Sequence, residues 1–126
     1  MAGEQILVVE DNERSMKLFQ DVLRATGYRT LEASTGGQAL MLAARHGPAL
    51  VLMDIRLPDM TGVEALSRLR MDERTARIPV LAVTAQAMKG DRQRFIEAGF
   101  DGYLSKPVDI DELLTTVERH CGGRSG

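Results

Sequence analysis

Residues 49–54 read Ala-Leu-Val-Leu-Met-Asp, five apolar residues that lead without interruption into an aspartate. Runs of this kind, without alternating polar residues, are typical of strands buried on both faces of a parallel sheet. Three further short runs also stop at polar residues. They are residues 6–9 before Glu10-Asp11, residues 80–83 before Thr84, and residues 103–105 before Lys106-Pro107. We therefore expect four buried parallel strands, each with a polar group at its carboxyl end.

Segments with helical spacing separate these runs. Their apolar residues recur every three or four positions, and several of the segments stop at a glycine. The expected helices lie within residues 12–27, 36–46, 62–71 and 88–98 and in a fifth segment opened by Asp109, and residues 29–33 supply one more strand. Five β-α units in strict alternation, joined by right-handed crossovers, predict an α/β fold. It is a doubly wound five-stranded parallel sheet with strand order 2-1-3-4-5 and five helices.

The composition limits the classes of function. The chain has 126 residues, a formal net charge of -2 and one cysteine, Cys121. Its length fits one domain, expected at residues 1–121 and followed by a disordered tail at 122–126. Lys and Arg are scattered among acids and no apolar stretch has membrane-spanning length, so we expect neither direct nucleic-acid binding nor membrane insertion. The lone cysteine and the missing secretory signal predict a cytoplasmic protein.

The polar strand ends predict one reaction site. In the expected strand order the first and third strands are neighbours, so Glu10 and Asp11 lie beside Asp54. Three clustered carboxylates repel one another unless a cation is present, and such oxygen ligands suit Mg²⁺ or Mn²⁺. The central carboxylate, Asp54, is a candidate nucleophile towards a phosphoryl group. Lys106 would add positive charge and Thr84 a hydroxyl.

Four segments carry a resemblance to a known family. They are residues 9–12 (Val-Glu-Asp-Asn), 53–58 (Met-Asp-Ile-Arg-Leu-Pro), 83–85 (Val-Thr-Ala) and 105–107 (Ser-Lys-Pro). Together they resemble the signature segments of a two-component response-regulator receiver domain, and the likeness covers essentially the whole chain. The resemblance implies a flavodoxin-like, CheY-like fold. It also implies that Asp54 accepts a phosphoryl group from a histidine kinase or a histidine phosphotransferase.

The same resemblance implies roles for the residues around Asp54. The positions of Glu10 and Asp11 hold Mg²⁺ together with Asp54 and the backbone carbonyl of Arg56. The positions of Thr84 and Lys106 contact the phosphoryl group. Tyr103 matches an aromatic residue that turns inward when Thr84 is drawn to the phosphate, and Lys106-Pro107 matches a cis peptide bond.

The resemblance also predicts partners. Residues 12–19 and 82–91 are most similar to stand-alone cell-cycle receivers, so we expect a phosphorylation-switched module that binds a downstream signalling protein and catalyses only its own phosphorylation and dephosphorylation. The expected partner surface comprises Asn12, Ser15, Gln86, Met88, Lys89, Arg92 and Tyr103. Two alternatives stay open. The chain could be the receiver of a larger hybrid kinase or regulator, or a phosphatase or phosphotransferase that forms an aspartyl-phosphate, although Arg56 stands where such enzymes commonly carry a second acid.

Overall fold

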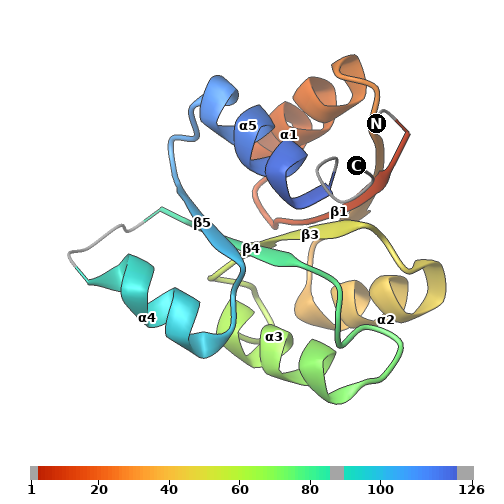
Figure 1. Ribbon diagram of the computed structural model, residues 1–126, viewed down its shortest axis with the longest axis vertical. Coiled ribbons are helices and arrows are strands. Elements are labelled where there is room, and N and C mark those ends of the chain that lie inside the picture. The colour runs from red at the N-terminus through yellow and green to blue at the C-terminus, as the bar shows by residue number, and fades with distance from the viewer. Residues whose placement is uncertain (1–2, 86–89, 122–126) are drawn as a thin grey trace.

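The computed structural model describes residues 3–85 and 90–121 of the chain (Figure 1). Strands and helices alternate along these residues, as the sequence predicts. The strands are β1 (Gln5–Val9), β2 (Arg29–Ala33), β3 (Leu50–Asp54), β4 (Val80–Thr84) and β5 (Gly102–Ser105). The helices are α1 (Glu13–Ala25), α2 (Gly36–His46), α3 (Gly62–Met71), α4 (Asp91–Ala98) and α5 (Ile110–Cys121).

The strands form one parallel sheet in the order β2-β1-β3-β4-β5, so the predicted fold and topology are confirmed. Val9 pairs with Met53, and Asp54 pairs with Val83 on the next strand. Thr84 pairs in turn with Ser105. The residues that follow β1, β3, β4 and β5 therefore meet at one edge of the sheet, where ligands of open α/β sheets bind.

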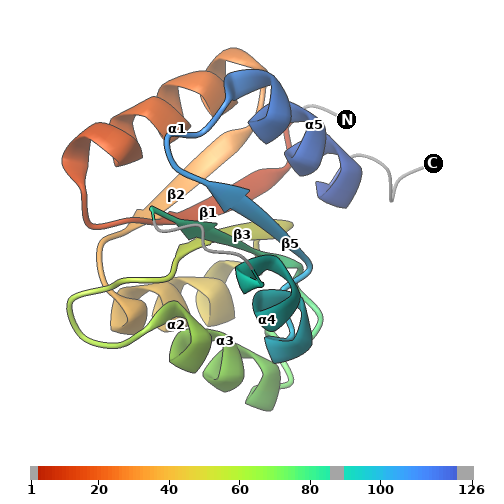
Figure 2. The ribbon, with the colours of Figure 1, turned by 90° about the vertical axis from the view of Figure 1, so that its left-hand side faces the viewer.

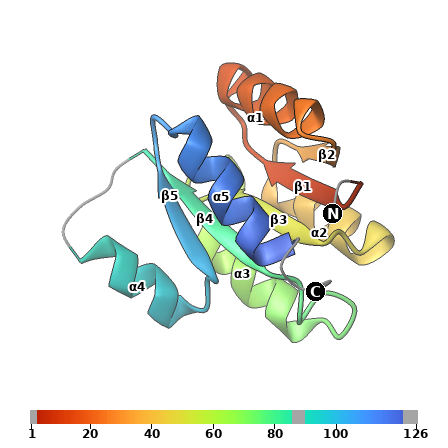
Figure 3. The ribbon, with the colours of Figure 1, turned by 45° about the horizontal axis from the view of Figure 1, so that its top comes forward.

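The sheet lies between two layers of helices (Figures 2 and 3), and an apolar core fills the space on each of its faces. Successive residues of a strand point to opposite faces, so Leu7 and Val9 lie in one core and Ile6 and Val8 in the other. Helices α2, α3 and α4 cover the first core, and α1 and α5 cover the second. With apolar layers on both faces the central strands are buried from end to end, which explains their lack of polar alternation.

Side-chain caps fix where four of the helices begin. In each case an oxygen of the capping side chain accepts a hydrogen bond from a backbone N–H three residues later, which satisfies a donor that the helix itself cannot. The caps are Asn12 on α1, Thr35 on α2, Thr61 on α3 and Asp109 on α5, with donor–acceptor distances of 3.0 to 3.1 Å. All four capped helices begin shortly after the carboxyl end of a strand, at the same edge of the sheet.

Helix α4 begins later than the sequence predicts. The predicted start at Met88 lies outside the described residues, and the described helix begins at Asp91. Gly90 has a φ of 90°, a left-handed conformation that cannot be part of a right-handed helix. The sequence interpretation placed Gly90 inside the helix, and that part of it was wrong. Among residues 3–85 and 90–121, no helix has the length and apolar character to cross a membrane.

Candidate functional site

The strand ends bring the predicted reactive residues together. Glu10, Asp54 and Thr84 are buried, with 2%, 6% and 6% of their surface exposed, whereas Asp11 is exposed. One carboxylate oxygen from each of Glu10, Asp11 and Asp54 lies within 4.8 Å of the others. The convergence expected from strand order is therefore present. Because Asp11 is the exposed member, the carboxylate cluster is open to solvent on the side of Asp11.

Lys106 reaches the cluster from the loop after β5. Its ammonium lies 2.7 Å from Glu10 Oε1 and 3.3 Å from Asp54 Oδ2. Its backbone N–H donates a 2.8 Å hydrogen bond to the carbonyl of Thr84, which ties the loop to β4. The Lys106-Pro107 peptide bond is cis, as the resemblance implies. The lysine thus bridges the carboxylates that end β1 and β3.

Backbone amides orient the two buried carboxylates. Asp54 Oδ1 accepts a hydrogen bond of 2.9 Å from the N–H of Arg56, and Glu10 Oε2 accepts one of 3.1 Å from the N–H of Asn12. The second oxygen of each carboxylate faces Lys106. Each carboxylate is therefore held between an amide on its own strand's loop and a shared lysine.

The electrostatics of the cluster favour an added cation. The pKa of Glu10 is raised to about 7, chiefly by burial and also by the neighbouring Asp54 carboxylate, while hydrogen bonds with Lys106 and the Asn12 amide act in the opposite direction. Burial also acts to lower the pKa of Lys106, but contacts with Glu10 and Asp54 outweigh it, so the net shift is upwards. Lys106 therefore does not fully offset the burial of Glu10. This all-oxygen donor set fits a hard divalent cation such as Mg²⁺.

We expect the metal-free protein to lose stability as the pH rises. The ordinary pKa of Glu10 is 4.5 and that in the folded protein is about 7, so between these values the folded state holds the extra proton. The free energy of unfolding should then fall as pH increases through this window, by about 1.4 kcal/mol per pKa unit of difference.

Thermal melts in the presence of a chelator across this pH range measure the fall in stability. Glu10→Gln should flatten the profile and Mg²⁺ should raise the melting temperature at the upper end. Coincident profiles for the variant and the wild type would contradict the assignment.

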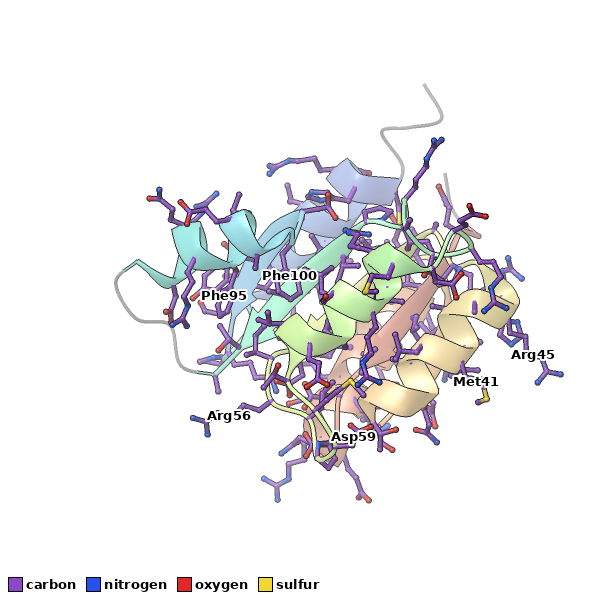
Figure 4. All side chains as sticks on the ribbon, turned by 90° about the horizontal axis from the view of Figure 1, so that it is seen from below. Met41, Arg45, Arg56, Asp59, Phe95 and Phe100 are labelled. Carbon is purple, nitrogen blue, oxygen red and sulfur yellow. The ribbon has the colours of Figure 1, made fainter. Side chains whose placement is uncertain are left out.

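Tyr103 packs against an aromatic pair on the α4 side of the sheet. Its ring stacks on that of Phe95 at a centroid distance of 5.7 Å and an interplanar angle of 28°, and Phe95 meets Phe100 edge-on at 5.9 Å. Figure 4 shows Phe95 and Phe100 together between α4 and the sheet. Burial, followed by the charge of Asp91, raises the pKa of Tyr103. The position of Tyr103 beside β4 suits the expected switch, which stays a prediction.

The expected partner surface divides into two regions. Ser15 lines a cleft of about 200 Å³ between α1 and the loop that carries Lys106, and Asn12 caps α1 just ahead of it. Arg92 and Tyr103 line a groove of about 480 Å³ between α4, β5 and α5. The other three predicted contacts, Gln86, Met88 and Lys89, lie outside the described residues.

Sequence reasoning missed one residue near the site. Asp59, in the loop between β3 and α3, accepts hydrogen bonds from the backbone N–H groups of Gly36 and Gly37 at 2.8 and 2.9 Å. These bonds lower its pKa. An aspartate after a proline is typical of a turn. No periodicity relates it to two amides more than twenty residues earlier, so only the fold reveals the contact.

Comparison with known proteins gives a consistent result. Residues 6–118 match the response regulator receiver domain. The polar-differentiation response regulator DivK of Brucella ovis is 44% identical over 119 residues, which cover 94% of this chain and 97% of the relative.

Two solved structures are also similar. The receiver domain of the sensor histidine kinase PA1611 from Pseudomonas aeruginosa, with a magnesium ion coordinated in its active-site cleft, has 39% identity and a TM-score of 0.88, over 96% of this chain and 99% of that one. The chemotaxis protein CheY4 of Vibrio cholerae has 28% identity and a TM-score of 0.86, over 94% and 98% of the two chains.

Proposed function

The chain belongs to the response regulator receiver domain family, and we propose that it is a single-domain regulator of a phosphorelay, with Asp54 as the phosphoryl acceptor. The observation that carries the proposal is the buried Asp54 carboxylate at the end of the central strand, beside two more acids and 3.3 Å from the Lys106 ammonium. The donor would be a histidine kinase or a histidine phosphotransferase. The output would be altered binding of a downstream signalling protein.

The residues around Asp54 have distinct proposed roles. An Asp54 carboxylate oxygen forms the new bond to phosphorus while the bond from phosphorus to the donor imidazole breaks, and its electron pair stays with the imidazole. Lys106, already beside Asp54 Oδ2, attracts a phosphoryl oxygen, and the Thr84 hydroxyl donates to another. In this proposal the protein promotes only its own phosphorylation and dephosphorylation.

The same site accommodates a divalent cation in the proposal. Glu10, Asp11 and Asp54 would hold it with the backbone carbonyl of Arg56, and the magnesium ion in the PA1611 receiver supports Mg²⁺, with Mn²⁺ as a second candidate. When bound, the cation supplies positive charge that offsets the negative charge of the phosphoryl oxygens.

Labelling with small phosphodonors tests the proposal. The protein should gain one phosphate from acetyl phosphate in the presence of Mg²⁺, and a chelator should prevent it. It should not turn over a panel of phosphomonoesters. Rapid release of phosphate from such esters, without stable labelling, would instead favour an aspartyl-phosphate phosphatase.

The surroundings of the site complete the proposal. The cleft beside Ser15 and Lys106 would receive the phosphodonor protein, and the face formed by α4, β5 and α5 would contact the downstream partner. We place the protein in the cytoplasm, with residues 1–121 as its receiver domain and without direct contact to nucleic acid or membrane. The interspersed charges of the chain, with a net charge of -2, support the absence of a nucleic-acid or membrane contact.

A second candidate is a receiver within a larger sensor kinase. The similarity to the PA1611 receiver favours it, because that domain belongs to a histidine kinase. Immunoblotting of a cell extract with an antibody against this domain would distinguish the single-domain protein from the larger kinase. A band at the mass of the 126-residue chain supports the single-domain protein, and a much larger band supports the kinase.

Thr84→Ala should separate phosphorylation from its output. Thr84 ends β4 beside β5, two residues beyond the partner of Tyr103 in the sheet register. We expect phosphate to draw the Thr84 hydroxyl inward and vacate space for the Tyr103 ring, which changes the α4, β5 and α5 surface. The variant should still accept phosphate but lose most of the phosphate-dependent gain in partner affinity. A tenfold gain corresponds to about 1.4 kcal/mol.

Binding of the phosphorylated and unphosphorylated forms to a captured partner measures the gain in affinity. Thr84→Ser keeps the hydroxyl and should behave like the wild type. A full phosphate response in the alanine variant would refute this route.

A further inference from the structure

Asp59 joins two elements that the sequence does not connect. It lies near the outer end of the loop of residues 55–61, and its two carboxylate oxygens accept one hydrogen bond each from consecutive amides at the start of α2. Figure 4 shows Asp59 on this loop, close to the first turn of α2. The negative charge sits at the positive end of the helix dipole, which strengthens the contact.

The same loop is anchored at its base. Arg56 and Thr61 form an antiparallel bridge, and the N–H of Gly62 donates a 2.7 Å hydrogen bond to the carbonyl of Ile55. Next to Asp59, the side chain of Met60 lies over Gly36 so closely that a Cβ added there would come within 2.5 Å of it. The loop is therefore closed at its base and fastened at its outer end by Asp59 and Met60.

The loop also carries the groups that hold the reactive aspartate. The N–H of Arg56 donates to Asp54 Oδ1 at 2.9 Å, and the carbonyl of Arg56 is a proposed ligand of the cation. Both groups belong to the backbone of one residue, so their positions depend on the path of the loop. Only two residues, Leu57 and Pro58, separate Arg56 from Asp59.

We propose that Asp59 is a positioning residue of the phosphorylation site: it fastens the loop of residues 55–61 to α2 and so fixes the Arg56 backbone against Asp54 and the cation. This inference rests on the proposed function. Asp59 itself does not touch the reacting groups. Its effect passes through the backbone, as with the outer partners of metal ligands in other proteins.

The alternative is that Asp59 only caps α2, and a matched pair of variants separates the two. Thr35→Ala removes a different cap from the same helix, the 3.1 Å hydrogen bond from the N–H of Gln38, and leaves the loop of residues 55–61 intact. Asp59→Ala removes a cap and the loop attachment together. Asp59→Asn is the graded variant, because an amide has one acceptor oxygen for two N–H donors.

The measurements are Mg²⁺ affinity, by titration of the purified chain well below its melting temperature, and hydrogen exchange of the Arg56 amide. Asp59→Ala should weaken Mg²⁺ binding by about tenfold or more and Asp59→Asn by less. The Arg56 amide should exchange faster in Asp59→Ala. Thr35→Ala should lower the melting temperature but leave both the affinity and the Arg56 exchange as in the wild type.

The outcomes separate this inference from the proposed function. Equal Mg²⁺ affinities of wild type and Asp59→Ala would overturn the positioning role alone, and so would equal losses in Asp59→Ala and Thr35→Ala. A wild type that binds no Mg²⁺ would overturn the proposed function and this inference with it. Loss confined to the Asp59 variants, graded from Asn to Ala, supports the inference.

Discussion

Asp54→Asn is expected to abolish phosphorylation. The side chain keeps its shape and can still accept the Arg56 amide, but the neutral amide is a poor nucleophile and loses the ion pair with Lys106. Incubation with acetyl phosphate and Mg²⁺, followed by intact-mass measurement, should show one added phosphate on the wild type and none on the variant.

Asp21→Asn is the matched control for this change. Asp21 is an exposed acid in the second half of α1 that forms an ion pair with Lys17, and it is not part of the acidic cluster. This variant should be labelled like the wild type. Labelling of Asp54→Asn at the wild-type level would show that another residue accepts the phosphate.

Gly62→Ala is expected to destabilise the fold strongly. A Cβ at this first residue of α3 would lie 2.6 Å from the carbonyl oxygen of Asp54 and 2.9 Å from the Cα of Ile55. Both are backbone atoms at the reactive end of the central strand, so the strand end or the helix must move. Overpacking of this kind typically costs about 1–3 kcal/mol, and here it should also slow phosphorylation. Urea denaturation measures the free energy of unfolding.

Gly37→Ala provides the comparison. Its Cβ would meet only Asp59 Oδ2, at an ordinary contact distance of 3.5 Å, and the N–H donor is kept. An alanine in a helix is favoured over glycine by roughly 0.5–1 kcal/mol, so this variant should be as stable as the wild type or more so. Similar losses in both variants would contradict the crowding argument at Gly62.

The sequence was sufficient to predict the sheet and the approach of the acids. A strand that is covered on both faces of the sheet carries no polar side chains, and apolar runs such as residues 50–53 therefore indicate buried strands. Strict alternation with helices then leaves few topologies, and the strand order follows. Once β1 and β3 are neighbours, the placement of Glu10 and Asp11 beside Asp54 is a consequence of chain direction.

Contacts set by backbone conformation or by distant partners were not predictable in the same way. The start of α4 depends on the left-handed φ of Gly90, and a glycine in a polar stretch is compatible with either a helix interior or its boundary. The 2.7 Å contact of Lys106 with Glu10 depends on the path of the loop after β5, which runs beside α1. The Asp59 contact involves amides, which every residue except proline carries, so no side-chain pattern marks them.

The division of the interior into two cores bears on how such a protein can diverge. Helix α1, which lines the proposed phosphodonor cleft, and the helix pair α2 and α3 rest on opposite faces of the sheet, and their buried apolar residues belong to separate clusters. Effects of mutations that share no contacts are close to additive. Substitutions in the core on one face of the sheet therefore need no compensating substitutions on the other face. The strand ends adjoin both layers, so substitutions there affect both.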